Sequence, residues 1–178
     1  MLLAAVVLAG GTAVRLDGAD KASIELDGRT FLEHTLAATA RAGEVVVVGD
    51  PVRTSRPVTF TREDPPLGGP AAGLVAGRHA LTAIPDLLVV LAVDMPRVTA
   101  STVDRLVAAV AGDGSVLVGP DGRDRIALVV RTAALDAATP DDAHGLPLHR
   151  LLAPLDLAPV TATGDEARGV DRWEDLRA

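Results

Sequence analysis

The sequence of 178 residues contains no cysteine, and this absence removes several kinds of chemistry at once. Without cysteine, a chain has no disulfide bond, no thiol nucleophile and no cysteine-ligated zinc or iron–sulfur site. Proteins without disulfides are typical of the cytoplasm, and we expect this protein to be cytoplasmic.

Aromatic residues are nearly absent as well, at 2% of the chain, with one tryptophan, two phenylalanines and no tyrosine. The core must be built from aliphatic residues, and little is available to stack the bases of a single-stranded nucleic acid. Positive charge is also scarce, because 17 lysines and arginines face 24 acidic residues, for a net charge of −7. These shortages predict no nucleic-acid partner, so any nucleotide ligand would be a single small molecule.

The chain also has no apolar run of the roughly 20 residues that a membrane span needs. Met1–Ala9 is apolar but lacks the basic residues of a secretory signal, and Leu87–Val93 is shorter still. We therefore expect a soluble protein with no membrane contact. Its length and its 48% of hydrophobic residues predict one domain over residues 1–178.

What the sequence does contain is an alternation of short β-branched runs with helical patterns. The runs are apolar at consecutive positions, as in strands that are buried on both faces. The expected strands are Leu2–Leu8, Val45–Val48, Val58–Phe60, Leu87–Val93, Ser115–Val118 and Ile126–Val130. The first expected helix begins at Thr30 and ends before Gly43. Three further helices are expected over Gly69–Leu81, Thr99–Ala111 and Leu146–Leu155. This alternation predicts an α/β fold of three layers, Rossmann-like, with a mostly parallel central sheet and helices on both faces.

Ligands of open α/β sheets bind beyond the carboxyl ends of the strands, and polar residues gather there in this sequence. Gly10 and Gly11 follow the first strand, where glycines let backbone N–H groups approach an anion. Arg15 and Lys21 come next and can contact phosphate oxygens. A solvated glycine-rich turn fits these residues equally well. Their spacing matches neither the dinucleotide fingerprint nor the P-loop.

Carboxylates follow two further strands. Glu63 and Asp64 precede a Gly-Pro helix start, where either could accept from a base or a ribose, or lie in an acidic surface loop. Asp94 directly follows an apolar strand, where a carboxylate is costly to bury without a cation. Mg²⁺ takes one or two protein carboxylates, so we expect Asp94 to be a magnesium ligand. Asp94 could instead cap the next helix, although Thr99 is better placed for that role.

From Leu8 to His34 the sequence resembles the N-terminal signature of the molybdenum cofactor guanylyltransferases, the MobA-like members of the nucleotidyltransferase fold. The shared pattern is Leu-Ala-Gly-Gly, then an arginine, a glycine and a lysine, and a Leu-x-Gly turn before a helix. The resemblance implies that the first motif holds a nucleotide through its backbone and that the two cations bind phosphates. The residues implied are Leu8, Ala9, Gly10, Gly11, Arg15 and Lys21.

The resemblance continues along the chain. Asp64 matches the acidic residue that contacts the nucleotide in that family, with Glu63 as its competitor, and Asp94 matches the magnesium-binding aspartate of an Asp-x-Pro motif. A weaker match over Val170–Leu176 places Asp171 where the family has an asparagine or aspartate near the active site. An amphipathic C-terminal helix is an equal interpretation of that stretch.

The resemblance implies a Mg²⁺-dependent transfer of GMP from GTP to Mo-molybdopterin, with release of pyrophosphate. Arg15, Lys21 and Asp94 would be the catalytic residues. Such chemistry is mostly positioning and charge neutralisation, in agreement with the lack of any hydrolase nucleophile motif. The expected partners are GTP and a molybdopterin-type acceptor, with transient contacts to other proteins of cofactor biosynthesis.

Three alternatives stay open. The family's His/Gln-Pro element is absent before Ile126, in a region that faces the acceptor in relatives. A cytidylyltransferase acting on molybdopterin or on a sugar or polyol phosphate would share the fold, the metal and the lysine, although such enzymes more often begin with Ala-Ala-Gly. A Rossmann oxidoreductase would fit the strand–glycine opening only, and a non-catalytic nucleotide-binding module would fit the fold.

Overall fold

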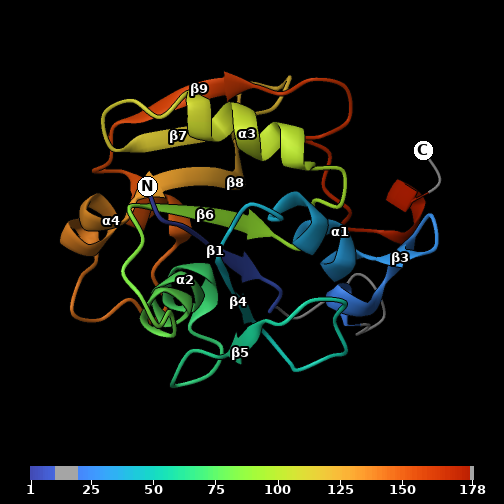
Figure 1. Ribbon diagram of the computed structural model, residues 1–178, viewed down its shortest axis with the longest axis horizontal. Coiled ribbons are helices and arrows are strands. Elements are labelled where there is room, and N and C mark those ends of the chain that lie inside the picture. The colour runs from blue at the N-terminus through green and yellow to red at the C-terminus, as the bar shows by residue number, and fades with distance from the viewer. Residues whose placement is uncertain (11–19, 177–178) are drawn as a thin grey trace.

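The computed structural model describes residues 1–10 and 20–176 and is built around one central sheet (Figure 1). Five strands follow the order β5-β4-β1-β6-β8, and β7 and β9 continue the sheet alongside β8. The strands are β1 (Leu3–Leu8), β4 (Glu44–Val48), β5 (Thr59–Thr61), β6 (Leu87–Ala92), β7 (Gly114–Val118), β8 (Asp124–Arg131) and β9 (Leu157–Thr161). The β1–β4, β1–β6, β4–β5 and β7–β9 pairs are parallel, whereas β8 runs antiparallel to β6. The predicted mostly parallel α/β sheet is confirmed.

The centre of the sheet is buried on both faces, which explains its runs of consecutive apolar residues. Every residue of β6 is buried. Because successive side chains of a strand point to opposite faces, Val89 and Leu91 pack into one core, and Leu88 and Val90 into the other. One apolar strand therefore serves both helical layers.

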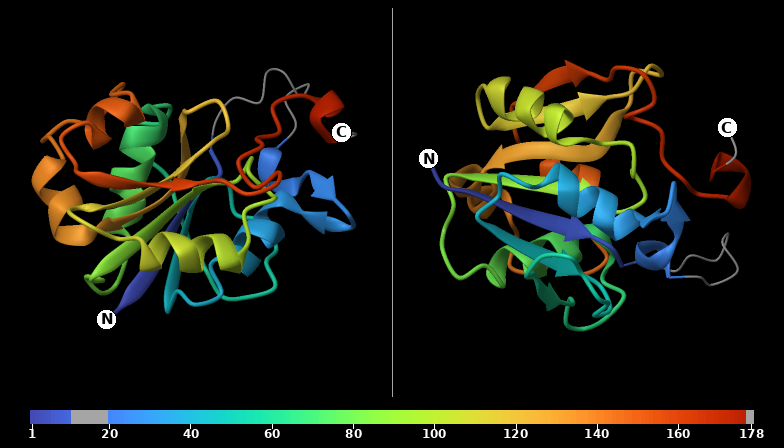
Figure 2. Two further views of the ribbon diagram at one scale, coloured as in Figure 1. Left: turned by 90° about the horizontal axis from the view of Figure 1, so that it is seen from above. Right: turned by 45° about the vertical axis from the view of Figure 1, so that its right-hand side comes forward.

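Helices cover the two faces of the sheet, as Figure 2 shows. α1 (Phe31–Ala38) and α3 (Ala100–Ala108) lie on one face, and α2 (Gly69–His79), α4 (Thr132–Ala138) and α5 (Leu148–Leu152) lie on the other. The three layers are thus the predicted ones. Within residues 1–10 and 20–176, none of the helices has both the length and the apolar character that crossing a bilayer would require.

Side-chain caps start two of the helices where the sequence predicts them. The Thr30 hydroxyl accepts a hydrogen bond from the backbone N–H of Glu33, and Thr99 and Thr102 form a reciprocal capping box. The structure ends α1 at Ala38, earlier than expected, because Thr39 leaves the helical conformation and its hydroxyl donates to a backbone carbonyl. Thr99 is the cap of α3, so Asp94 has no capping role there.

Close packing against the sheet explains why α2 has a glycine at position 77. A Cβ at Gly77 would lie 2.6 Å from Cγ1 of Val6 and 3.0 Å from Cγ2 of Val48. Glycine weakens a helix interior, but here it lets the helix backbone approach the sheet closely. This close approach sets the position of α2, whose N-terminal end borders the site described below.

Several short elements have no counterpart among the predicted ones. They are β9, α4, the hairpin of β2 (Glu25–Leu26) and β3 (Arg29–Thr30), and the 3-10 helix η2 (Lys21–Ser23). A second 3-10 helix, η3 (Trp173–Leu176), lies in the stretch where a C-terminal helix is one of two interpretations of the sequence. β9 contains Pro159, which weakens its strand pattern and is tolerated at a sheet edge. α4 begins without a side-chain cap, and each hairpin strand has only two residues, too few for periodicity to detect.

Candidate active site

The carboxyl ends of the parallel strands meet at one edge of the sheet and are joined there by backbone hydrogen bonds. The N–H of Ala9 donates to the carbonyl of Val48 at 2.9 Å, and that of Val93 donates to the carbonyl of Leu8 at 3.0 Å. The N–H of Gly49 donates to the carbonyl of Thr61 at 3.0 Å. The segments after β1, β4, β5 and β6 are therefore neighbours. The candidate residues that follow these strands are expected to meet at this edge of the sheet.

Lys21 lies between two carboxylates at this edge. Its Nζ is 3.0 Å from Oδ2 of Asp94, just beyond β6, and 3.1 Å from Oδ1 of Asp171, near the end of the chain. Asp20 fixes the backbone beneath Lys21, because its side chain accepts from the N–H of Ala22 and from the Ser23 hydroxyl. The fold thus brings the predicted pair Lys21 and Asp94 together and adds Asp171 to it.

The two carboxylates keep Lys21 charged. Partial burial alone would lower the pKa of the Lys21 ammonium, but the charges and hydrogen bonds of Asp94 and Asp171 outweigh that effect and raise the pKa above its ordinary value. A raised pKa means that the Lys21 charge stabilises the fold at neutral pH, and that this contribution is lost as the pH rises through the pKa of Lys21 in alkaline solution. The site therefore holds a permanent cation in the neutral range.

The chain that carries Asp171 is fixed at several points. We call residues 163–171 the C-terminal segment. The N–H of Val170 donates to the backbone carbonyl of Asp94 at 2.8 Å, and Nε of Arg125 donates to the carbonyl of Ala167 at 3.0 Å. Beyond the segment, Asp175 accepts from the N–H groups of Asp171 and Arg172, and these hydrogen bonds lower the pKa of the Asp175 carboxyl. Asp171 is therefore held beside Asp94 by its backbone.

Glu166 anchors the C-terminal segment to α3, and no motif in the sequence marks it. Its side chain is 9% exposed and accepts from the Thr102 hydroxyl at 2.6 Å and from the N–H of Thr163 at 2.6 Å. The guanidinium of Arg105 also pairs with it. A buried carboxylate with this many donors is a fixed structural element rather than a free base.

A cavity of about 520 Å³ adjoins the predicted nucleotide-binding backbone. Its wall is apolar apart from one carboxylate and backbone groups. The lining residues are Leu8, Gly10, Val48, Glu63, Leu67, Gly69, Pro70 and Gly73. The carboxylate in this cavity belongs to Glu63.

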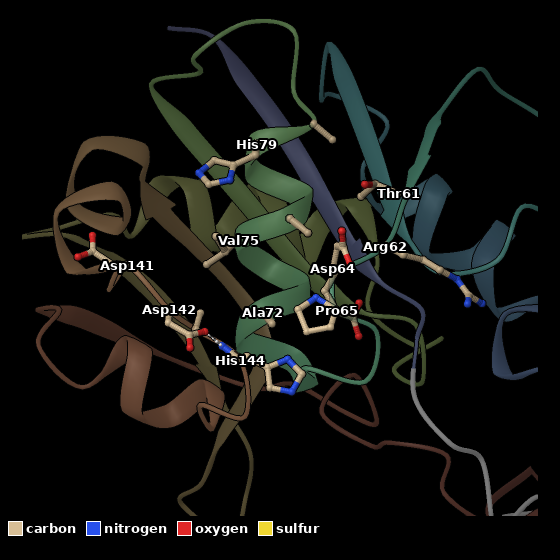
Figure 3. Close-up of a pocket in the computed structure, with 14 residues that line it drawn as sticks. Thr61, Arg62, Asp64, Pro65, Ala72, Val75, His79, Asp141, Asp142 and His144 are labelled. Carbon is tan, nitrogen blue, oxygen red and sulfur yellow. Dashed lines mark hydrogen bonds between the residues drawn. The ribbon is translucent and has the colours of Figure 1, made fainter.

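Asp64 lines a different space. It borders a pocket of about 470 Å³ between the end of β5, α2 and the residues before α5, together with His79, Asp142 and His144 (Figure 3). Glu63 borders both spaces, whereas Asp64 is not among the residues that line the first. Sequence spacing favours Asp64 as the nucleotide contact, but its competitor Glu63 is the one that lines the same cavity as Leu8 and Gly10.

Two of the predicted residues, Gly11 and Arg15, lie outside the described residues, and their roles stay predictions. Leu8 and Ala9 are nearly buried at the end of β1, and Gly10 is exposed at the mouth of the cavity. Exposed backbone next to a cavity is what the predicted nucleotide contact requires.

The donor set at Lys21 suits a magnesium ion. Asp94 and Asp171 both reach the same ammonium group, so their oxygens lie close enough to share a cation. Among residues 1–10 and 20–176, no cluster of three or more His, Cys, Asp or Glu side chains could hold a metal. A pair of carboxylates fits Mg²⁺, which keeps several waters and takes substrate phosphates as ligands.

Comparison with known proteins shows which proteins the chain resembles in sequence and in fold. The curated molybdenum cofactor guanylyltransferase of Acidiphilium cryptum (strain JF-5) is 41% identical over 115 residues, which cover 61% of this chain and 59% of that protein. Among solved structures, a Mycobacterium sp. strain JC1 homologue of Mycobacterium tuberculosis Rv0371c superposes with a TM-score of 0.77 at 23% identity, covering 98% of this chain and 93% of that one. The 2-C-methyl-D-erythritol 4-phosphate cytidylyltransferase of Thermus thermophilus gives 0.70 at 21% identity, with 99% and 96% coverage.

The fold is therefore that of the nucleotidyltransferases, with a Lys–Asp–Asp cluster and a cavity at the carboxyl edge of the sheet. Within that class, the chain belongs to the MobA-like NTP transferase domain family, whose profile matches residues 5–173. The matched part spans about three fifths of the length of the curated relatives.

Proposed function

We propose that this protein is a molybdenum cofactor guanylyltransferase, which transfers GMP from GTP to Mo-molybdopterin and releases pyrophosphate. The observation that carries the proposal is Lys21, held between Asp94 and Asp171 at the carboxyl edge of the sheet, the edge at which Leu8 and Gly10 line a cavity. The family and the names of the curated relatives support the same reaction. A Rossmann oxidoreductase has no use for this cluster.

In the proposed reaction, a phosphate oxygen of the acceptor forms a bond to the α-phosphorus of GTP. The bond from that phosphorus to the bridging oxygen breaks, and its electron pair leaves with pyrophosphate. No protein nucleophile is needed, so the protein contributes position and charge.

Each residue has a task in this step. The Lys21 ammonium donates to phosphate oxygens and offsets the negative charge that develops on them. Exposed backbone at Gly10 holds the nucleotide, and Glu63 or Asp64 accepts hydrogen bonds from its base or ribose. Asp94, with Asp171 beside it, would hold Mg²⁺, which supplies further neutralisation of phosphate charge when bound. Arg15 would assist Lys21.

Pyrophosphate release tests the proposal. Purified protein with Mg²⁺ should release pyrophosphate from GTP when molybdopterin is present, and should not do so when either substrate is omitted. Release from CTP instead of GTP would make it a cytidylyltransferase, the activity named for the Thermus thermophilus structure. No release and no binding of any nucleoside triphosphate would end the enzyme proposal.

The remaining expectations accompany this proposal. They are that the metal is Mg²⁺ rather than another divalent ion, that the enzyme works in the cytoplasm and that it contacts other proteins of cofactor biosynthesis only transiently. A single domain over residues 1–178 also stays a prediction.

A further inference from the structure

Leu67 combines two features that are unusual for a leucine. Its backbone φ is +65°, in the left-handed region that favours glycine, and its side chain is 78% exposed. A branched side chain in this conformation is strained, and its apolar surface gains nothing from water. Two glycines follow directly in the sequence. Leucine therefore occupies a turn position with a positive φ, which glycine would adopt without strain.

The surrounding structure confines the backbone immediately after Leu67. The carbonyl of the next residue, Gly68, accepts a hydrogen bond from the N–H of Gly145 at 2.8 Å. A Cβ at Gly68 would come within 2.7 Å of Cβ of Ala72 and 2.9 Å of Nδ1 of His144, so α2 and the segment before α5 confine the backbone there. Local strain that the surroundings impose is found most often where a side chain has a functional task.

Leu67 lines the cavity that also includes Leu8, Gly10 and Glu63. No aromatic side chain is among the residues described around that cavity, so a base bound there has no ring from them to stack on. A nucleobase has flat apolar faces that must be covered and a polar edge that must be hydrogen-bonded. Glu63 offers an acceptor for such an edge, and the aliphatic residues offer cover for the faces.

We propose that Leu67 covers the face of the nucleobase and is a base-binding residue of the nucleotide site. This inference rests on the proposed function, because it needs a nucleoside triphosphate in the cavity. The exposed apolar surface of Leu67 is then buried only when the base binds. Leu67 therefore contributes to affinity for the base and not to affinity for the phosphates.

The test compares Leu67→Ala and Leu67→Gly with the wild type by calorimetry, using GTP and inorganic triphosphate as two probes in the presence of Mg²⁺. Both variants should bind GTP about tenfold more weakly, since an apolar side chain no longer becomes buried. Inorganic triphosphate, which has no base, should bind all three proteins equally. The Leu67→Gly protein should melt at or above the wild-type temperature, because glycine relieves the left-handed conformation.

Ile84→Ala is the matched control. Ile84 is also a large aliphatic residue with 74% exposure, but it precedes β6 at the amino ends of the strands, opposite the cavity. Its variant should bind GTP as the wild type does. An equal loss in Ile84→Ala would show that the effect is not local and would overturn the inference.

Other outcomes also overturn it. Wild-type GTP affinity in Leu67→Ala would show that Leu67 does not contact the base, while the proposed function stands. Equal weakening of GTP and inorganic triphosphate would place the effect in the phosphate site. If the wild-type protein binds neither GTP nor any other nucleoside triphosphate, the proposed function itself fails, and the inference fails with it.

Discussion

Asp94 is the residue on which the proposed metal chemistry depends most directly. It follows the fully buried strand β6 and shares Lys21 with Asp171. We predict that Asp94→Asn lowers the rate of pyrophosphate release by about 10²–10³, because a neutral amide neither holds Mg²⁺ well nor adds negative charge to the site. The melting temperature should change little, because Lys21 keeps its pairing with Asp171. Pyrophosphate release at saturating Mg²⁺ and a thermal melt measure the two effects.

Asp136→Asn is a suitable control for that prediction. Asp136 accepts hydrogen bonds from Nε and Nη2 of Arg78 at 3.1 and 2.8 Å, in an ion pair between α4 and α2. This ion pair includes no predicted site residue, so its loss should leave the rate unchanged. A wild-type rate in Asp94→Asn would remove Asp94 from the metal site.

The residues of the site differ in how far the sequence predicts them. Asp94 is predictable because it follows a buried strand, and parallel strands bring their carboxyl ends together. Lys21 is predictable because it belongs to the N-terminal motif that follows the first strand. Asp171 lies 150 residues from Lys21 and follows no strand directly, so only a weak motif points to it. Glu63 and Asp64 are neighbours, and sequence spacing alone does not decide which of the two faces the cavity.

At the scale of elements, the C-terminal segment links α3 to the cluster of Lys21, Asp94 and Asp171. Glu166 is the buried group in this link, with Thr102 and Arg105 of α3 as its partners. We predict that Glu166→Ala destabilises the protein by about 3 kcal/mol, because it leaves the half-buried guanidinium of Arg105 without its carboxylate. The rate of pyrophosphate release should fall as well, because Asp171 is no longer held beside Asp94. Chemical denaturation and steady-state kinetics measure these effects.

Two further variants make that prediction specific. Asp104, also on α3, pairs with Arg41 at the surface, so Asp104→Asn should change stability by no more than about 0.5 kcal/mol. If Glu166 acts on the reaction through Asp171, adding Glu166→Ala to Asp171→Asn should lower the rate no further. Additive losses in the rate would show that Glu166 affects the site by another route.

The elements that the sequence predicts are those with strong apolar periodicity or clear caps. β6 and α3 belong to this group, since one is buried at every position and the other begins with a capping box. β9 and α4 do not, because tertiary contacts rather than local signals fix them: β9 pairs with β7, and Leu135 of α4 packs under the sheet. Motif analysis does not detect Glu166 for the same reason, because its partners on α3 lie about 60 residues away in the sequence.

Over the whole molecule, the net charge of −7 and the local chemistry of the site act in opposite directions. The acidic surface repels polyanions, whereas Lys21 provides a cation at the edge of the sheet where the cavity opens. Two carboxylates already neutralise that cation in the ligand-free protein, so it offers little attraction to a long polyanion. A triphosphate with bound Mg²⁺ brings its own neutralising charge and suits this site better.

We therefore predict that the protein binds GTP with Mg²⁺ but not a short single-stranded oligonucleotide. A nucleic-acid-binding protein gains orders of magnitude in affinity when salt is lowered from about 200 to 50 mM, because neutralised phosphates release counterions. Here lower salt strengthens the repulsion between two anions, so fluorescence anisotropy of a labelled oligonucleotide should stay flat across that range. An affinity that rises steeply at low salt would reveal a basic surface and contradict the prediction. Unlabelled GTP that displaces the oligonucleotide would place that surface at the proposed nucleotide site.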